Sequence, residues 1–255
     1  MKKIDFKASV MLNPVPAVMI SSRNKEGKDN IFTVSWVNTV CTRPPMLSIS
    51  IRPERLSHDY ITESMEFIVN VPSSKLTYET DFCGVKSGKK VDKIKELNLK
   101  MIEGEHVNAA YIDDCPVAIE CRVKQIIKLG SHDLFIADVL GSHIDENMLD
   151  EKGKIHFELG DLINYAHGEY YPMAKKAIGR FGYSTKITKE EDTKNKENLL
   201  NKTISSSILK EDNKVEIPKE KSKPRRRTLS KTDIVKAKSS NKSKKTSSKK
   251  SRSKA

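Results

Sequence analysis

The stretch NIFTVSWVNTVCTRPPMLSISIRPERLSHDYI, residues 30–61, decides the fold. Its two runs at 31–40 and 46–51 are rich in β-branched and aromatic residues, and they alternate apolar with hydroxyl-bearing side chains. Such alternation is typical of β-strands that turn one face to a core. The intervening Pro44–Pro45 pair excludes a helix between the runs. The stretch therefore predicts two strands, each with hydroxyl groups along one face.

Alternate side chains of a strand share a face, so the hydroxyl groups of the two runs would form a strip that ends in a cation. Periodicity alone leaves two interpretations of this strip open. It faces water, as in most half-buried strands, or it binds a ligand. The strip would consist of Thr33, Ser35, Thr39, Ser48, Ser50 and Arg52, opposite the apolar faces formed by Phe32, Val34 and Trp36 and by Leu47, Ile49 and Ile51.

The residues after the second run favour an anion site. Arg52 and Arg55 precede Ser57, which is expected to cap a helix over 57–64. A helix N-terminus with free backbone N–H groups, an arginine and a hydroxyl group together suit a phosphate. An ordinary helix cap with exposed arginines is the alternative interpretation.

A second anion candidate is the turn Ser87–Gly88–Lys89, which is expected to lead directly into an amphipathic helix over 89–98. The turn resembles a P-loop only superficially. GVKSGKK has three residues between its glycines where the motif needs four, and no Ser or Thr follows the lysine. The sequence also lacks GxGxxG, HExxH and GxSxG motifs, so it carries no Rossmann, zinc-protease or nucleophile-elbow signature.

The remaining segments indicate the fold class. Short strands and helices follow one another without regular alternation, which argues against a doubly wound parallel sheet. The pattern predicts a mainly β fold with helical excursions, either a barrel or a sandwich. The further candidate strands are 14–22, 66–71, 117–130 and 132–144, and the further candidate helix is 75–84.

The net charge of +13 belongs entirely to the C-terminal part of the chain. Residues 1–190 hold 26 Lys and Arg against 26 Asp and Glu, whereas residues 191–255 hold 21 against 8. All fifteen aromatic residues lie in the first part. A Lys- and Ser-rich stretch without aromatics buries too little apolar surface to fold. We therefore expect a neutral domain at 1–187 and a basic, disordered tail at 188–255.

Compartment and metal content follow from simpler features. No apolar run is long enough to span a bilayer, and the N-terminus does not resemble a signal peptide. The four cysteines form no CxxC pair and have no histidine at finger spacing. These features predict a cytoplasmic protein with reduced thiols, and a zinc site is the less favoured alternative.

The series NPVPAVMISS, NIFTVSW, PPMLSISIRPERLSHDYI and EFIVNVP resembles the flavin reductase-like, FMN-binding split-barrel family, and most closely its flavoredoxin-like branch. DFCGVKSGKKVDKIKELNL, CPVAIECRVKQIIKLGSHDLFIADVL and HGEYYPMAKKAIGRFGYS extend the resemblance over about residues 8–185, in order. The resemblance implies a Greek-key split β-barrel, usually a homodimer with FMN at the subunit interface. The tail has no counterpart in the family.

Carried over residue by residue, the resemblance places the isoalloxazine ring against the TVSW strand and the phosphate near the arginine that follows the second run. No residue stands out as catalytic, because a flavin brings its own redox chemistry. The implied ring contacts are Thr33, Val34, Ser35 and Trp36, and the other implied cofactor contacts are Ser50, Ile51, Arg52 and Ser57, with Lys89 as a further contact.

The implied activity is hydride transfer from NADH or NADPH to FMN, followed by electron delivery to a second flavin or a redox protein. Two alternatives stay open. A flavoredoxin-like protein could take its electrons from another protein and use no nicotinamide, or the barrel could bind FMN poorly and act as a structural or sensing module. The residues alone predict that the basic segment 221–255 associates non-specifically with nucleic acid or another polyanion, against the alternative of a solvated tail.

Overall fold

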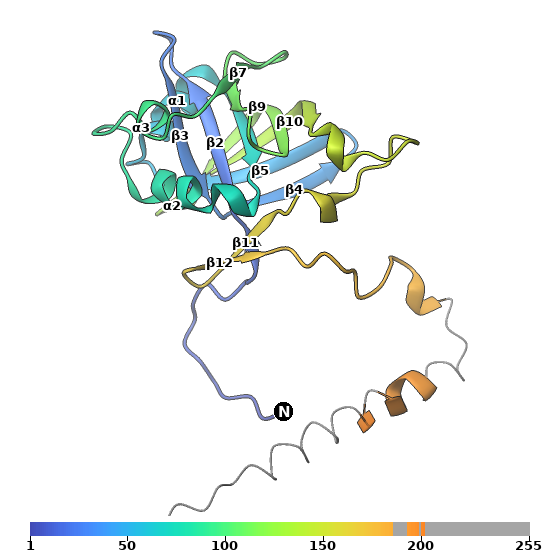
Figure 1. Cartoon of the computed structure of the whole chain (residues 1–255). Coiled ribbons are helices and arrows are strands. Elements are labelled where there is room, and N and C mark those ends of the chain that lie inside the picture. The colour runs from blue at the N-terminus through green and yellow to red at the C-terminus, as the bar shows by residue number, and fades with distance from the viewer. Residues whose placement is uncertain (186–192, 199, 202–255) are drawn as a thin grey trace, which may run out of the picture. The chain divides into compact units, whose positions relative to one another are not determined.

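The computed structural model describes residues 1–185, 193–198 and 200–201, and its first compact unit runs from Met1 to Phe181 (Figure 1). The boundary expected at residues 187–188 and the polyanion-binding segment expected at 221–255 lie outside the described residues, so both stay predictions. Of the tail expected to be disordered, the described residues 193–198 and 200–201 are helical. No helix among the described residues is long and apolar enough to cross a membrane.

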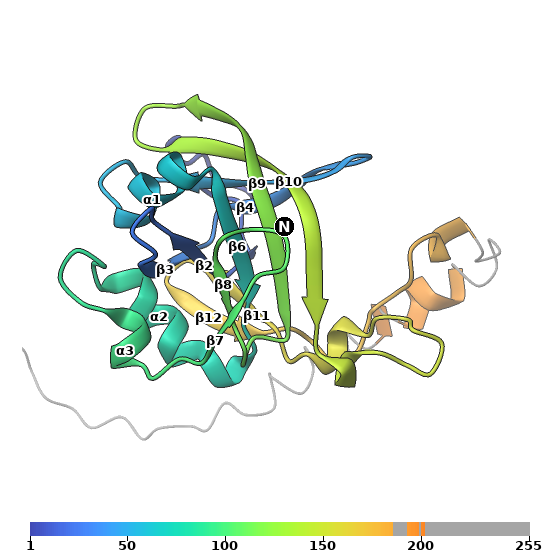
Figure 2. The same cartoon turned by 90° about the horizontal axis from the view of Figure 1, so that it is seen from above.

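Seven antiparallel strands form the main sheet, in the order β3-β2-β6-β9-β10-β5-β4. β3 (Asp29–Val34) and β4 (Val37–Thr42) are the two edges of this sheet, yet only two residues separate them in sequence. Such a connection spans at most about 11 Å, so the edges must meet and the sheet must close into a barrel (Figure 2). The other strands are β2 (Val18–Arg23), β5 (Pro45–Ile51), β6 (Glu66–Val71), β9 (Val117–Lys128) and β10 (Asp133–Ile144).

The run 31–40 forms two strands, and the single strand that its alternation predicts is wrong. The N–H group of Ser50 donates to the carbonyl oxygen of Trp36 at 3.0 Å, and Val37 pairs with Ile49. After β3 the chain therefore crosses to the opposite edge of the sheet, where it forms β4 and pairs with β5. Trp36, which the alternation places on the buried face, is 40% exposed at this bend. The opening beside the bend is the split of the barrel.

The barrel encloses one apolar core, because alternate residues of its strands turn inward. The apolar faces predicted for the two runs belong to this core, except for Trp36 at the bend. The core consists of Val18, Ile20, Phe32, Val34, Leu47, Ile49, Ile51, Ile61, Phe67, Val69, Cys121, Val123, Phe135 and Ala137.

Three helices lie beside β2 and β3 (Figure 1): α1 (Leu56–Ser64), α2 (Thr77–Val85) and α3 (Lys93–Glu96). The helix predicted at 75–84 is confirmed as α2. The helix predicted at 89–98 is much shorter, because the side chain of Asp92 accepts a hydrogen bond from Lys95 N at 3.2 Å and caps α3 there. The turn 87–89 therefore does not lead directly into a helix.

The chain also forms two small sheets. The first has the order β1-β11-β12, and its middle strand reaches the split of the barrel through Tyr165. The predicted strand 14–22 is divided between this sheet and the barrel. The bounds are β1 (Val15–Pro16), β11 (Ile163–Ala166) and β12 (Glu169–Pro172), β7 (Met101–Glu103) paired with β8 (Ala110–Ile112), and the 3₁₀ turns η1 (Ser74–Leu76), η2 (Glu146–Met148), η3 (Phe157–Leu159) and η4 (Tyr183–Thr185).

Glu120 of β9 is a fully buried carboxylate that holds the loop before β8. Its Oε2 accepts hydrogen bonds from His106 N at 2.7 Å and Val107 N at 3.0 Å. Its Oε1 accepts from Glu105 N at 3.0 Å and lies 2.6 Å from His143 Nε2. Burial alone would raise the pKa of Glu120, but these hydrogen bonds outweigh burial and lower it. The ionised carboxylate thus ties the loop to the β9–β10 hairpin.

Glu120→Gln should lower the free energy of unfolding by about 2–4 kcal/mol, because an amide NH₂ cannot accept from the backbone N–H groups that it would face. Glu105→Gln removes the same charge from an exposed position of the same loop and should change the free energy by less than about 0.5 kcal/mol. Urea unfolding followed by circular dichroism measures both. Equal stability of the two variants would contradict the role given to Glu120.

The same contacts set a pH dependence. The pKa of Glu120 lies below its ordinary value of 4.5, so the native state binds this proton less well than the unfolded state does. The stabilisation is therefore present above pH 4.5 and is lost as the pH falls through the lowered pKa.

Candidate functional site

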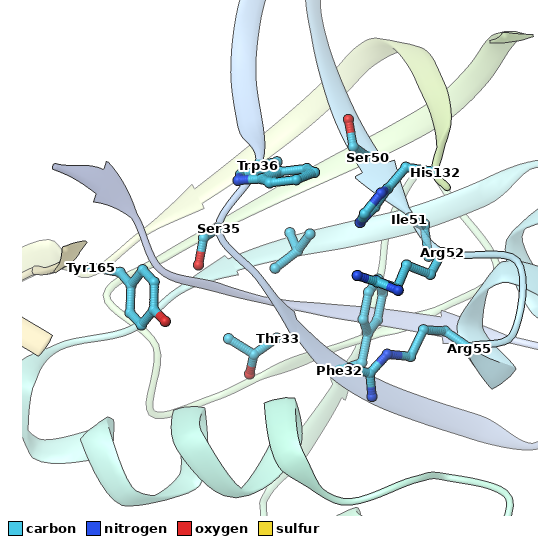
Figure 3. Close-up of a pocket in the computed structure, with 11 residues that line it drawn as sticks. Phe32, Thr33, Ser35, Trp36, Ser50, Ile51, Arg52, Arg55, His132 and Tyr165 are labelled. Carbon is cyan, nitrogen blue, oxygen red and sulfur yellow. The ribbon is translucent and has the colours of Figure 1, made fainter. Parts of the chain in front are cut away.

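A cavity of about 240 Å³ opens at the split of the barrel (Figure 3). The closure of the sheet brings together the end of β3, the end of β5 and the turn before β10, which are far apart in sequence. Seven predicted cofactor contacts line the cavity, together with four further residues. The lining consists of the predicted contacts Thr33, Val34, Ser35, Trp36, Ser50, Ile51 and Arg52 and of Phe32, Arg55, His132 and Tyr165.

Thr33 lies where β3 passes α2 (Figure 3). Its hydroxyl group donates to the carbonyl oxygen of Thr80 at 2.5 Å. A Cβ on Gly84 would lie only 3.3 Å from the Cβ of Thr33, so the helix approaches the strand closely at a residue without a side chain. Because the hydroxyl hydrogen is already used, Thr33 Oγ1 can serve a ligand only as an acceptor.

Trp36 and His132 form one wall of the cavity. Their ring centroids are 4.6 Å apart and their planes are tilted by 44°. His132 Nδ1 lies 2.9 Å from Ser131 Oγ in the turn between β9 and β10. Burial lowers the pKa of His132, and the nearby Arg52 lowers it further, while Glu54 opposes the shift. Burial and Arg52 therefore both disfavour the imidazolium form of His132.

One end of the cavity is cationic. Arg52 follows β5, Arg55 precedes α1, and Figure 3 shows both guanidinium groups beside the same opening. Arg52 Nη1 lies 3.5 Å from Glu54 Oε1, but both side chains are exposed and such pairs are weak. The residues that line the cavity include no carboxylate. Two guanidinium groups at one end of the cavity therefore favour an anionic group of a ligand.

Ser57 and Lys89 do not line the cavity, and the helix cap predicted for Ser57 is wrong. Ser57 is 1% exposed and its hydroxyl oxygen accepts from Asn30 Nδ2 at 2.5 Å. The N-cap of α1 is Arg55, without a side-chain cap. The exposed Lys89 Nζ lies 3.7 Å from Asp59 Oδ2. A contact of either residue with a cofactor stays a prediction.

Two lining residues had no usable signal in the sequence. His132 stands in an ordinary turn between two strands, and Tyr165 belongs to a strand too short to recognise by alternation. Tyr165 is positioned by its edge contact with Tyr170, at 5.5 Å between ring centroids. The Tyr170 hydroxyl in turn donates to Asp81 Oδ1 at 3.2 Å. Burial, followed by the Asp81 carboxylate, raises the pKa of Tyr170 to about 12.

A second cavity of about 340 Å³ adjoins the first across Ser35, Trp36 and Tyr165, which line both. Val10 and Leu12 of the N-terminal segment contribute apolar surface to it. The second cavity therefore borders the aromatic end of the first cavity from another side. Among the described residues, no group of three or more His, Cys, Asp or Glu is placed to hold a metal ion.

Comparisons with known proteins agree with this geometry. The model of the flavin reductase like domain matches residues 10–174. The structure of flavoredoxin from Desulfovibrio vulgaris (Miyazaki F) is similar at a TM-score of 0.68 and 27% identity, covering 72% of this chain and 100% of that one. Flavoredoxin from Methanosarcina acetivorans matches at a TM-score of 0.68 and 26% identity, covering 74% and 100%.

An uncharacterised protein of Archaeoglobus fulgidus is 31% identical over 131 residues, which are 51% of this chain and 74% of that protein. The residues that match the domain model include every residue that lines the cavity at the split. They also span the strands of the barrel, from β2 to β10. The match covers more than half of the 255 residues, and the chain belongs to the flavin reductase-like family of split-barrel flavoproteins.

Proposed function

We propose that the protein is an FMN-dependent oxidoreductase that accepts hydride from NADH or NADPH and passes electrons to a second flavin or a redox protein. One observation carries the proposal: in a member of the flavin reductase-like family, a single cavity joins a cationic end to an aromatic and hydroxyl-bearing end. The negative charge of a flavin phosphate suits the cationic end. The flat ring of a flavin suits the aromatic and hydroxyl-bearing end.

The residues of the cavity fit FMN in a defined direction. Arg52 and Arg55 would pair with the phosphate, where guanidinium groups form charge-assisted hydrogen bonds. The ring would lie along the bend between β3 and β4, against Trp36. There Thr33 Oγ1, which donates its hydrogen to Thr80 O, could accept a hydrogen bond from the ring, and the hydroxyl of Ser35 could donate one.

The bound flavin would supply the hydride and electron chemistry. The residues of the chain bind, orient and shield it. Trp36 and Tyr165 would cover apolar surface of the flavin at the ring end of the cavity. Among the described lining residues there is no carboxylate that would repel negative charge on the flavin. The adjoining second cavity would give a reaction partner access to the ring.

The proposal includes a homodimer. β4 is an edge of the main sheet, and its hairpin with β5 projects beyond the barrel (Figure 2). Val40 of this strand is 50% exposed, and Trp36 before it is 40% exposed. An edge strand with an exposed apolar side chain is a surface for pairing with another chain.

Val40→Lys should shift the protein from dimer to monomer in size-exclusion chromatography with light scattering, because a charge would be buried at the interface. Val85→Lys is the matched control, since Val85 is a 69% exposed apolar residue on α2. A wild-type monomer, or equal behaviour of the two variants, would contradict an interface at β4.

A second candidate function is electron transfer without a nicotinamide. The similarity to two flavoredoxin structures, at 27% and 26% identity, favours it. Both candidates use the same flavin site, so they differ only in the electron donor.

The purified protein, loaded with FMN, should show flavin absorption bands that bleach on anaerobic addition of NADH or NADPH. Stopped-flow absorbance with each nicotinamide identifies the donor. Bands that persist with both nicotinamides, but bleach with a reduced redox protein, would favour the electron carrier. Failure to retain any flavin after incubation with FMN would contradict both candidates.

Arg52→Ala should weaken FMN binding about 10- to 100-fold, because it removes a charge-assisted hydrogen bond to the phosphate. Riboflavin, which lacks the phosphate, should bind the variant and the wild type within about twofold. Arg122→Ala is the control, since Arg122 is an exposed arginine that pairs with Glu66 outside the cavity. Isothermal titration calorimetry measures the affinities. Equal loss of FMN and riboflavin would place the phosphate elsewhere.

A further inference from the structure

We propose that His132 is a third phosphate-recognition group, which takes up a proton when the phosphate of FMN binds between Arg52 and Arg55. This inference rests on the proposed function. It makes the preference for FMN over riboflavin depend on pH, with His132 as the residue that sets this pH dependence.

The position of His132 carries the inference. It comes from the turn between β9 and β10, and it lines the same cavity as Arg52 and Arg55. Figure 3 shows its ring between Trp36 and Arg52. The ring is held in place by the contact with Trp36, at 4.6 Å between centroids, and by Ser131 Oγ, 2.9 Å from Nδ1. An imidazole fixed beside Arg52, in a cavity that Arg55 also lines, is placed to meet the anion that the two arginines attract.

The charged groups around His132 make its protonation sensitive to an anion. Arg52 faces it from the end of β5 and disfavours the imidazolium, whereas the exposed Glu54 favours it weakly. Arg55, the N-cap of α1, lines the same cavity. Asp133, the next residue along β10, is turned to His58, at 2.9 Å between Oδ2 and Nε2. Among the described residues that line the cavity, none therefore offers His132 a carboxylate.

A phosphate monoester reverses this balance. It carries a charge of about −1.5 to −2 at neutral pH and offers three acceptor oxygens. Bound at Arg52, it offsets the guanidinium charge that disfavours the imidazolium, and it can accept a hydrogen bond from it. The pKa of His132, lowered in the empty cavity, should therefore rise, and one proton from solvent should bind to the ring.

Linkage fixes the sign of the effect. Because the ligand raises the pKa, FMN binds more tightly as the pH falls through the pKa of the complex, and the gain levels off below the pKa of the empty site. Arg52 and Arg55 stay charged throughout and add no pH dependence of their own. Riboflavin brings no anion, so its affinity should not follow this titration.

The test compares FMN and riboflavin affinities of the full chain at pH 6.5 and 8.5, above the phosphate pKa of about 6. The ratio of the two affinities should rise about three- to tenfold at the lower pH in the wild type, which corresponds to a pKa shift of about one to two units. His132→Gln should remove most of this rise. His156→Gln is the matched control, because His156 is paired with Asp150 and Glu158 outside the cavity and should behave as the wild type.

A second measurement needs no variant. Trp36 is the only tryptophan of the chain, so its fluorescence reports directly on the ring of His132. Without flavin, the emission should titrate with a midpoint below pH 6.5, and saturating inorganic phosphate should move the midpoint upward. Calorimetry in buffers of different ionisation enthalpy should show proton uptake with FMN and none with riboflavin.

The outcomes separate the inference from the proposed function. If FMN binds and depends on Arg52, but the wild type and His132→Gln share one pH dependence and no proton is taken up, only the role of His132 is overturned. If FMN does not bind, or binds without dependence on Arg52, the proposed phosphate site fails and the inference fails with it.

Discussion

The structure depends on one constraint, the two-residue connection between the edges of its main sheet. β3 and β4 lie at opposite ends of the strand order, but Ser35 and Trp36 alone join them. A short link can be satisfied only if the sheet curls until its edges meet. The hydrogen bond from Ser50 N to Trp36 O, at 3.0 Å, fixes the meeting point. The connectivity therefore brings the two edges of the sheet together at the bend, and the split opens beside it.

The same constraint decides which groups face the cavity. Residues at the bend leave the regular alternation, so Trp36 turns outward while Val34 before it stays in the core. The end of β5 arrives beside the bend and presents Arg52. On the other side, the close approach of α2 at Gly84 and the bond from Thr33 to Thr80 hold β3 against the helix. Thr33 is thus anchored to the backbone of α2 at the ring end of the cavity, which suits a ligand that must be oriented.

The sequence predicts the strands better than the site. Strand-forming composition located β6, β9 and β10, because runs of β-branched and other apolar residues form these strands, with a turn at residues 130–131 between the last two. It failed at the bend, where a run of strand-forming residues continues through a change of direction that only the closed barrel explains. His132 and Tyr165 could not be found, because no local pattern marks a side chain that reaches a site through tertiary packing.

The resemblance to the flavin reductase-like family implied nine cofactor contacts, and seven of these residues line the cavity. The helix-cap argument for Ser57 failed for a different reason. It treated a hydroxyl before a helical pattern as free to cap, whereas the buried Asn30 already uses that oxygen. A hydrogen-bond partner 27 residues away is invisible to any argument from local spacing.

The lysines near the predicted anion-binding turn do not line the cavity, and one of them is buried. The turn that suggested Lys89 as a cation is followed by Lys93, which is 3% exposed and donates to the carbonyl oxygens of Cys83 at 3.1 Å and Lys86 at 3.4 Å. Burial lowers the pKa of Lys93 to about 8. This amine therefore closes the C-terminal end of α2, and the helix on which Thr33 rests depends on it. The cationic end of the cavity is left to guanidinium groups, whose charge does not change near neutral pH.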